Sequence, residues 1–144
     1  MIYKMQHANL RLPELLELTD TVPAEYRNWA SDVYGYHITS LDSIDSIKQN
    51  GIYANSSRQS YDRPECVYLF LDHEIDSDNI KILLGDVDSF AIVTVKLPAA
   101  EVKKMRFDGL YNISFDCGYG AIQYFDNVPA EYIIGIDIMN RKAL

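Results

Sequence analysis

The chain is poor in cysteine, and its cysteines follow no ligand pattern. Cys66 and Cys117 are the only two among 144 residues. Two cysteines cannot build the disulfide framework of a small secreted scaffold, and neither stands at metal-ligand spacing from another cysteine or a histidine. We therefore expect no metal site and a reducing, cytoplasmic location.

Long hydrophobic runs are also missing. The first 18 residues, "MIYKMQHANLRLPELLEL", contain no continuous apolar stretch of the length that a signal peptide or a membrane-spanning helix needs. Export by the general secretory route and contact with a membrane are therefore not expected.

Positive charge is scarce. Thirteen lysines and arginines stand against 21 aspartates and glutamates, which gives a formal net charge of −8 and a pI near 4.7. The closest approach to a basic cluster is the short stretch "VKKMR" at 102–106. Affinity for a nucleic-acid backbone depends on clustered Lys and Arg that displace counterions, so the composition argues against it. An acidic surface suits a basic protein partner.

The common catalytic signatures are absent too. The chain has no glycine-rich phosphate loop, no H-E-x-x-H pair and no nucleophile elbow. The segment "DCGYG" at 116–120 follows no strand that leads into a long helix, and we interpret it as a turn. Cys117 has no histidine partner visible in the sequence, so a thiol nucleophile is the less favoured hypothesis.

What the chain does have is enough apolar material for one domain. Hydrophobic residues make up 48% of it, and a chain of this length buries roughly two thirds of its unfolded surface. We predict a single domain over 1–144, with a helical N-terminal extension at 1–34 packed on a core at 35–139. The eleven tyrosines suit a cleft that stacks on rings, or half-buried positions on sheets.

Hydrophobic spacing predicts helices toward the N-terminus and strands after them. The expected helices are 13–20, 21–35, 40–51 and 77–86, and the expected strands are 36–39, 66–72, 89–97, 121–125 and 132–139. The segment 100–107 fits a brief helix or an edge strand equally well. No regular alternation of strand and helix appears, which favours an α+β domain with one or two small antiparallel or mixed sheets.

Two further features of the pattern concern the joins between elements. Residues 126–131 carry turn chemistry and join the last pair of strands, and Ser77 is the expected cap of its helix. The pentapeptide "VPAEY" occurs at 22–26 and again at 128–132. Because the flanking residues differ, we interpret the recurrence as a coincidence.

His37 is the histidine with the most suggestive surroundings. It ends an expected strand and stands immediately before Thr39 and Ser40, either of which can cap the next helix. Side chains and backbone N–H groups converge on polar ligands at such a helix start. A histidine on a strand is more often a packing residue, so both interpretations stay open.

Three segments, in this order, carry a family resemblance. The stretch "YHITSLDSIDSIKQNGIY" joins a strand with His and Thr to a helix that ends at "NGI". "CVYLFLD" is a strand that presents an aromatic residue, and "AIQYFDNVPAEYIIGIDI" has an amide on a strand followed by a proline-bearing turn. Together, over residues 34–139, they resemble the ADP-ribosyltransferase-like fold. The resemblance is in particular to small bacterial and phage members related to DNA-targeting toxins, poly-ADP-ribose polymerases and RNA 2'-phosphotransferases.

The resemblance implies two small mixed or antiparallel sheets around a cleft for NAD, with N-terminal helices, and it implies roles for five residues. His37 stands where the family's histidine holds the 2'-hydroxyl of the nicotinamide-side ribose, and Thr39 where a small hydroxyl residue lies near the nicotinamide. Tyr68 matches the aromatic residue that stacks on the nicotinamide ring, with Phe70 on the same strand face as the alternative. Gln123 stands at the position of the catalytic glutamate.

The implied catalytic residues are therefore His37, Tyr68 and Gln123, and NAD is the implied substrate. The loop at 55–64, with Arg58 and Arg63, stands where related proteins contact the pyrophosphate, a task that suits an arginine fork. A solvated loop arginine is the plain alternative.

The reaction implied is cleavage of the bond between nicotinamide and ribose, through a transition state with positive charge on the ribose. A glutamine can hold a ribose hydroxyl, but it cannot act as a general base. Asp116 and Asp126 are close enough in sequence to Gln123 to be candidate substitutes for the missing carboxylate.

The sequence leads to one principal hypothesis and two rivals. The first is a mono-ADP-ribosyltransferase that modifies a protein or nucleic-acid target, as a bacterial toxin or phage effector with a cognate antitoxin. The second is a non-catalytic inhibitor or adaptor whose acidic surface binds a basic partner. The third, an RNA 2'-phosphotransferase, requires basic residues around a 2'-phosphate, and the chain has too few.

Overall fold

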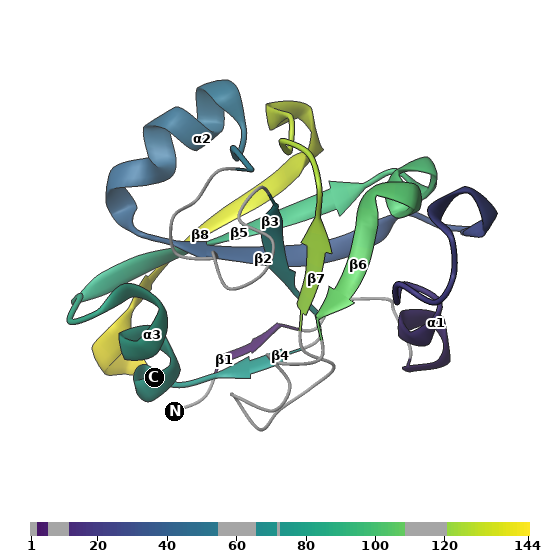
Figure 1. Ribbon diagram of the computed structural model, residues 1–144. Helices are drawn as coiled ribbons and strands as arrows, with labels where there is room; N and C mark the ends of the chain where they lie inside the picture. Colours follow the sequence, from purple (N-terminus) through teal and green to yellow (C-terminus); the bar gives the residue numbers. More distant parts are fainter. Residues whose placement is uncertain (1–2, 6–11, 55–65, 72, 109–120) are drawn as a thin grey trace.

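One six-stranded antiparallel sheet dominates the computed structural model, which describes residues 3–5, 12–54, 66–71, 73–108 and 121–144 (Figure 1). The strand order is β6-β7-β3-β2-β5-β8. The strands are β2 (Val33–Thr39), β3 (Val67–Phe70), β5 (Ser89–Leu97), β6 (Met105–Asp108), β7 (Ala121–Tyr124) and β8 (Ile133–Asn140). A separate two-stranded antiparallel sheet pairs β1 (Tyr3–Met5) with β4 (His73–Ile75). The α+β class is as expected.

The helices are few and short. The α-helices are α1 (Leu12–Leu16), α2 (Ile44–Asn50) and α3 (Ser77–Leu84). Short 3-10 turns occupy Ala24–Tyr26, Leu41–Ser43, Ala99–Lys104, Ala130–Tyr132 and Arg141–Ala143. No helix within the described ranges is long and apolar enough to cross a membrane.

The central strands of the six-stranded sheet are buried on both faces, which explains their nearly continuous apolar runs. Alternate residues of these strands belong to different clusters. The first core cluster takes from the sheet Val33, Val67, Leu69, Val93, Val95, Leu97, Ile122 and Tyr124. The second core cluster takes Tyr36, Ile38, Tyr68, Phe70, Phe90, Ile92 and Ala121.

Different helices cover the two faces. Leu15 and Leu18 at the N-terminal side and Ile47 of α2 pack into the first core cluster. Ile80 of α3 packs into the second, together with the partly buried Leu144 at the C-terminus. The apolar periodicity of each short helix thus determines which residues it buries, and the sheet is the common layer between them.

Several predicted elements are confirmed. The strand at 89–97 has the predicted bounds, and the helix after His37 ends at Gly51 with φ of 79°, a conformation that favours glycine. The segment 100–107 turns out to contain both alternatives, a 3-10 turn followed by the edge strand β6.

The predicted helix at 21–35 is wrong. Only Ala24–Tyr26 forms a helical turn, and β2 already begins at Val33, which is fully buried in the first core cluster. The cause is Arg27, whose side chain is 6% exposed and donates hydrogen bonds to the main-chain carbonyls of Thr19, Val22 and Met105. This tie to β6 is a tertiary interaction, which a helical apolar spacing cannot reveal.

Gly35, predicted to end that helix, lies instead inside β2. A Cβ atom built at Gly35 would come 2.8 Å from the Cβ of Leu69, closer than real Cβ contacts. β2 and β3 share one register pair, Tyr36 with Phe70, whereas β2 and β5 share seven. Glycine is therefore required here because two strands cross at close range.

Three smaller expectations also need correction. The predicted final pair of strands is not a pair, because β7 and β8 are separated by β3, β2 and β5 in the sheet. Asp76, not Ser77, caps α3: its side chain accepts a hydrogen bond from the Asn79 N–H at 2.9 Å, and the Asp76 N–H donates to the Asn79 Oδ1. The helix predicted at 13–20 ends already at Leu16.

Candidate functional site

The three predicted catalytic residues lie on three neighbouring strands. Gln123 is on β7, Tyr68 on β3 and His37 on β2, and β3 lies between the other two strands in the sheet. Tyr68 and Gln123 stand directly opposite each other in the β3–β7 register. Tyr68 is thus the residue through which the other two are connected.

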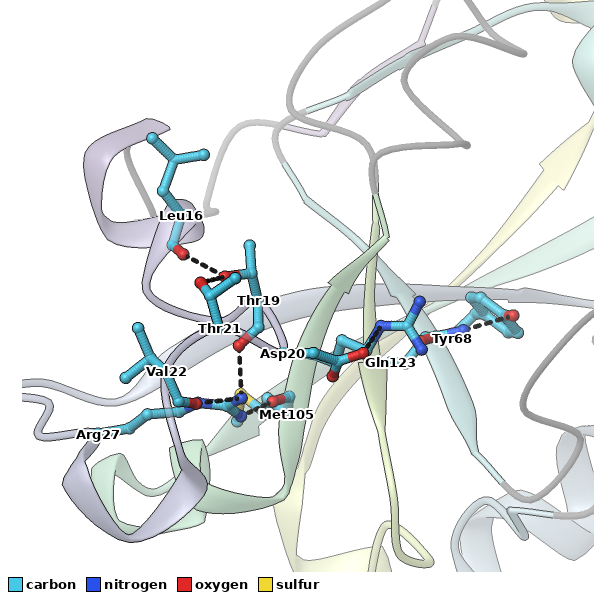
Figure 2. Close-up of polar contacts among 10 residues, drawn as sticks. Leu16, Thr19, Asp20, Thr21, Val22, Arg27, Tyr68, Met105 and Gln123 are labelled. Carbon is cyan, nitrogen blue, oxygen red and sulfur yellow. Dashed lines mark hydrogen bonds and ion pairs between the residues drawn. The ribbon is translucent and has the colours of Figure 1, made fainter.

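Tyr68 and Gln123 form a buried polar pair (Figure 2). The Gln123 Nε2 donates to the Tyr68 Oη at 2.8 Å, and the exposed fractions of the two residues are 2% and 0%. Since the phenol oxygen accepts this bond, its own proton is directed to another acceptor. The hydrogen bond holds the amide and the phenol in one orientation.

His37 approaches the same strand from the other side. Its Nδ1 lies 3.5 Å from the main-chain oxygen of Tyr68, a long contact to which an N–H at that position would donate. The register places His37 opposite Val93, a member of the first core cluster, while Tyr68 belongs to the second. The fold therefore brings His37 to the backbone of Tyr68, and places its side chain on the opposite face of the sheet from Gln123.

The predicted NAD-contacting residues also lie on both faces of the sheet. Thr39, 8% exposed, stands two residues beyond His37 and shares its face of β2. Phe70, 4% exposed, shares the face of Tyr68 in the second core cluster. Arg58 and Arg63 lie outside the described residues, as do Asp116 and Cys117, so these predictions remain as they were.

Arg106 is a neighbour of this site that the sequence prediction did not include. It stands opposite Gln123 in the β6–β7 register, so Arg106, Gln123 and Tyr68 form a polar row across three strands on one face. The Arg106 Nε lies 3.7 Å from an oxygen of Asp20. The sequence feature that could have identified Arg106 is the edge-strand interpretation of 100–107. In a strand, alternation places the side chains of Arg106 and Met105 on opposite faces.

Two basic residues of the stretch "VKKMR", Lys104 and Arg106, form ion pairs in the structure. Lys104 Nζ lies 2.8 Å from Asp126 and 3.2 Å from Glu101, and Arg106 faces Asp20. The hydrogen bond to Asp126 raises the pKa of Lys104 above its usual 10.5. Two of the three basic residues of this stretch, Lys104 and Arg106, therefore have acidic partners.

Asp126 is a poor substitute for a catalytic carboxylate. The hydrogen bond from Lys104 lowers the pKa of Asp126 below its usual value of 3.8, and the Asn127 N–H, which also donates to the carboxylate, acts in the same direction. A carboxylate stabilised in its charged form is a weak base. Nearby, burial raises the pKa of Tyr124, whose hydroxyl donates to Glu101 at 3.2 Å.

Within the part of the chain that the structure describes, no group of His, Cys, Asp and Glu side chains could hold a metal ion. Comparisons with known proteins add no family: no protein-family model, no curated protein and no solved structure matches the chain.

Proposed function

We propose that the protein is a cytoplasmic mono-ADP-ribosyltransferase that uses NAD to modify a protein or nucleic-acid target, in the manner of a toxin or phage effector. The observation that carries the proposal is the placement of His37, Tyr68 and Gln123 on adjacent strands. Gln123 bonds the Tyr68 side chain, whereas His37 lies on the other face of the sheet and reaches only the Tyr68 main-chain oxygen, so a shared site also requires His37 to be brought to the face of Gln123. These are the residues on which the resemblance of the sequence to the ADP-ribosyltransferase-like fold depends.

The chemical types of these side chains fit NAD. An aromatic ring can stack on nicotinamide, and an amide can hold a ribose hydroxyl. Tyr68 is 2% exposed, so a nicotinamide ring can reach its face only after the groups that cover it move. Binding of NAD must then be accompanied by a rearrangement at this end of the sheet.

Gln123 limits what the site can do. Its amide supplies a dipole where a glutamate would supply a full negative charge, so it can orient a ribose but contributes less to a cationic transition state. We therefore expect slow release of nicotinamide, governed by positioning and exclusion of water. The variant Gln123→Glu should release nicotinamide faster, by about tenfold or more.

The test is nicotinamide release and NAD-dependent thermal stabilisation of the purified chain. His37→Ala should abolish both, and Tyr68→Phe should reduce both because it removes the acceptor for the Gln123 amide. Tyr26→Phe, at a side chain that is 71% exposed, is the matched control and should behave as wild type. Turnover by His37→Ala at the wild-type rate would contradict the proposal.

One observation favours the non-catalytic alternative. Gln123 is neutral, fully buried and bonded to Tyr68, an arrangement that also suits a core that has no chemistry to perform. A binding protein of this kind would use its net charge of −8 to bind a basic partner. Partner affinity that falls with added salt and is unaffected by His37→Ala would support this alternative.

A further inference from the structure

The outer edge of β8 carries an inference that is independent of NAD. β8 is the last strand of the six-stranded sheet and pairs with β5 alone among the described strands. In such a strand every second residue points its N–H and C=O outward, away from the sheet. These groups can be satisfied in register by another extended chain.

β8 is regular along most of its length. Six consecutive register pairs join it to β5, from Gly135 opposite Thr94 to Asn140 opposite Ser89. A bulge between Thr94 and Val95 interrupts the ladder on the other side of Gly135 and leaves Ile134 as the extra residue. The regular stretch of β8 at 135–140 is as long as a typical strand.

The side chains of β8 are unusual for an edge that only avoids aggregation. Bulges and charges commonly protect edge strands, and β8 has one of each, the bulge at Ile134 and the exposed Asp137. Large apolar side chains, however, undo such protection. Ile138 is 66% exposed and Ile134 is 55% exposed.

The charge on β8 selects the partner. Asp137 is exposed and forms no ion pair within the described chain. β8 itself contains no lysine or arginine, so a second copy paired through β8 and centred on Asp137 would bring another Asp137 and no cation. The net charge of −8 on each copy further disfavours pairing of two copies, because the copies repel each other. A partner strand that alternates apolar and basic residues would pack an apolar side chain against Ile138 on one face and pair a basic side chain with Asp137 on the other.

We propose that the outer edge of β8, residues 135–140, docks an extended lysine- or arginine-bearing segment of a partner protein. The segment adds to the sheet as a further strand next to β8. Its main chain supplies the affinity, and its basic side chain opposite Asp137 supplies the selectivity.

The experiment is an NMR titration of the full isotope-labelled chain with a ten-residue peptide of alternating valine and lysine. We expect saturable shifts at the amides of 135–140 and slower hydrogen exchange at alternate amides there. Ile138→Ser should weaken binding about tenfold. Ile82→Ser is the matched control, because Ile82 on α3 is 70% exposed and should not affect binding.

Three outcomes would overturn the proposal. One is the absence of saturable shifts at 135–140 while the protein remains folded. Another is equal binding of an alternating valine and glutamate peptide, or unchanged preference in Asp137→Lys, because the charge of Asp137 would then have no role. The third is concentration-dependent dimerisation in analytical ultracentrifugation that Ile138→Ser abolishes, which would assign the edge to a second copy of the chain.

Discussion

The two edges of the six-stranded sheet differ in what lies against them. β6, a strand of four residues, is covered by the N-terminal segment: the Phe107 N–H donates to the Leu18 carbonyl at 2.9 Å, and Arg27 donates to the Met105 carbonyl. β8, a strand of eight residues, has its inner side on β5 and exposes Ile134 and Ile138. One edge is closed from within the chain, and the other pairs with no further strand among the described residues.

The difference shows how a single buried arginine can close a sheet edge. The guanidinium of Arg27 contacts carbonyls of Thr19, Val22 and Met105, so it joins three points of the chain (Figure 2). The donors of the guanidinium and the carbonyls satisfy each other, which makes burial of the charge tolerable. No comparable side chain covers the outer side of β8 in the described ranges, and the comparison can be tested at both edges.

The largest effect should come from opening the closed edge. Arg27→Met keeps the apolar stem but removes the guanidinium donors from three main-chain carbonyls, of which that of Thr19 keeps the Val22 N–H, so the free energy of unfolding should fall by about 3 kcal/mol or more. Urea denaturation measures it. Lys96→Met is the control, since the ion pair of Lys96 with Asp32 is exposed and is worth under about 1 kcal/mol. Equal decreases in the free energy of unfolding of the two variants would show that Arg27 does not stabilise this edge.

The next effect compares a glycine at the centre of the sheet with one on the open edge. Gly35→Ala should lower the free energy of unfolding by about 1–3 kcal/mol, because the new Cβ would meet Leu69. Gly135→Ala on β8 meets nothing within 4 Å, so its effect should stay within about 1 kcal/mol or be stabilising. Paired thermal denaturation curves check the difference, and a costly Gly135→Ala would show that β8 is more constrained than the structure indicates.

The third effect concerns the ion pair beside β6. The pKa of Asp126 is lowered in the folded protein, so its contribution to stability is present above the unfolded pKa of about 3.8 and is lost as the pH falls through the folded pKa. Lys104 has a raised pKa, so its contribution is present below 10.5 and is lost as the pH rises through its folded value.

Because both side chains are half exposed, Asp126→Asn should lower the free energy of unfolding at neutral pH by less than about 1 kcal/mol. The difference between this variant and wild type should disappear in acid. Urea denaturation of both proteins at about four pH values between pH 2 and pH 7 measures this difference in the free energy of unfolding. A difference that persists in acid would mean that the Asp126 carboxylate is not its source.

The smallest effect should come from the open edge itself. Ile138→Thr should change the free energy of unfolding by less than about 0.5 kcal/mol, because the side chain is already 66% exposed. Ile92→Thr, on the neighbouring strand and 1% exposed, should destabilise several times more. A large loss in Ile138→Thr would indicate that β8 contributes to the core and is not an accessible edge.

Much of the local structure follows from local sequence. The strand at 89–97 is a β-branched and aromatic run that Pro98 ends, and neither feature depends on distant residues. The order of strands does not follow in this way. β7 and β8 look like one final pair in sequence, yet β3, β2 and β5 lie between them in the sheet.

The candidate site shows the same division. The sequence was sufficient to place His37, Tyr68 and Gln123 on strands. The register then decided that Gln123 bonds Tyr68, and that His37 lies opposite Val93 on the other face. Arg106 escaped the prediction because its place beside Gln123 exists only once β6 pairs with β7.

The recurring pentapeptide "VPAEY" separates the two kinds of information most directly. In both copies the proline, Pro23 or Pro129, has nearly the same backbone angles, and the next three residues form a 3-10 turn. The last residue, however, is 71% exposed as Tyr26 and packs against the first core cluster as Tyr132. The proline ring sets φ without help from the rest of the chain, so the sequence alone determined the turn. Burial depends on which distant surface the turn meets, and only the tertiary structure decided that.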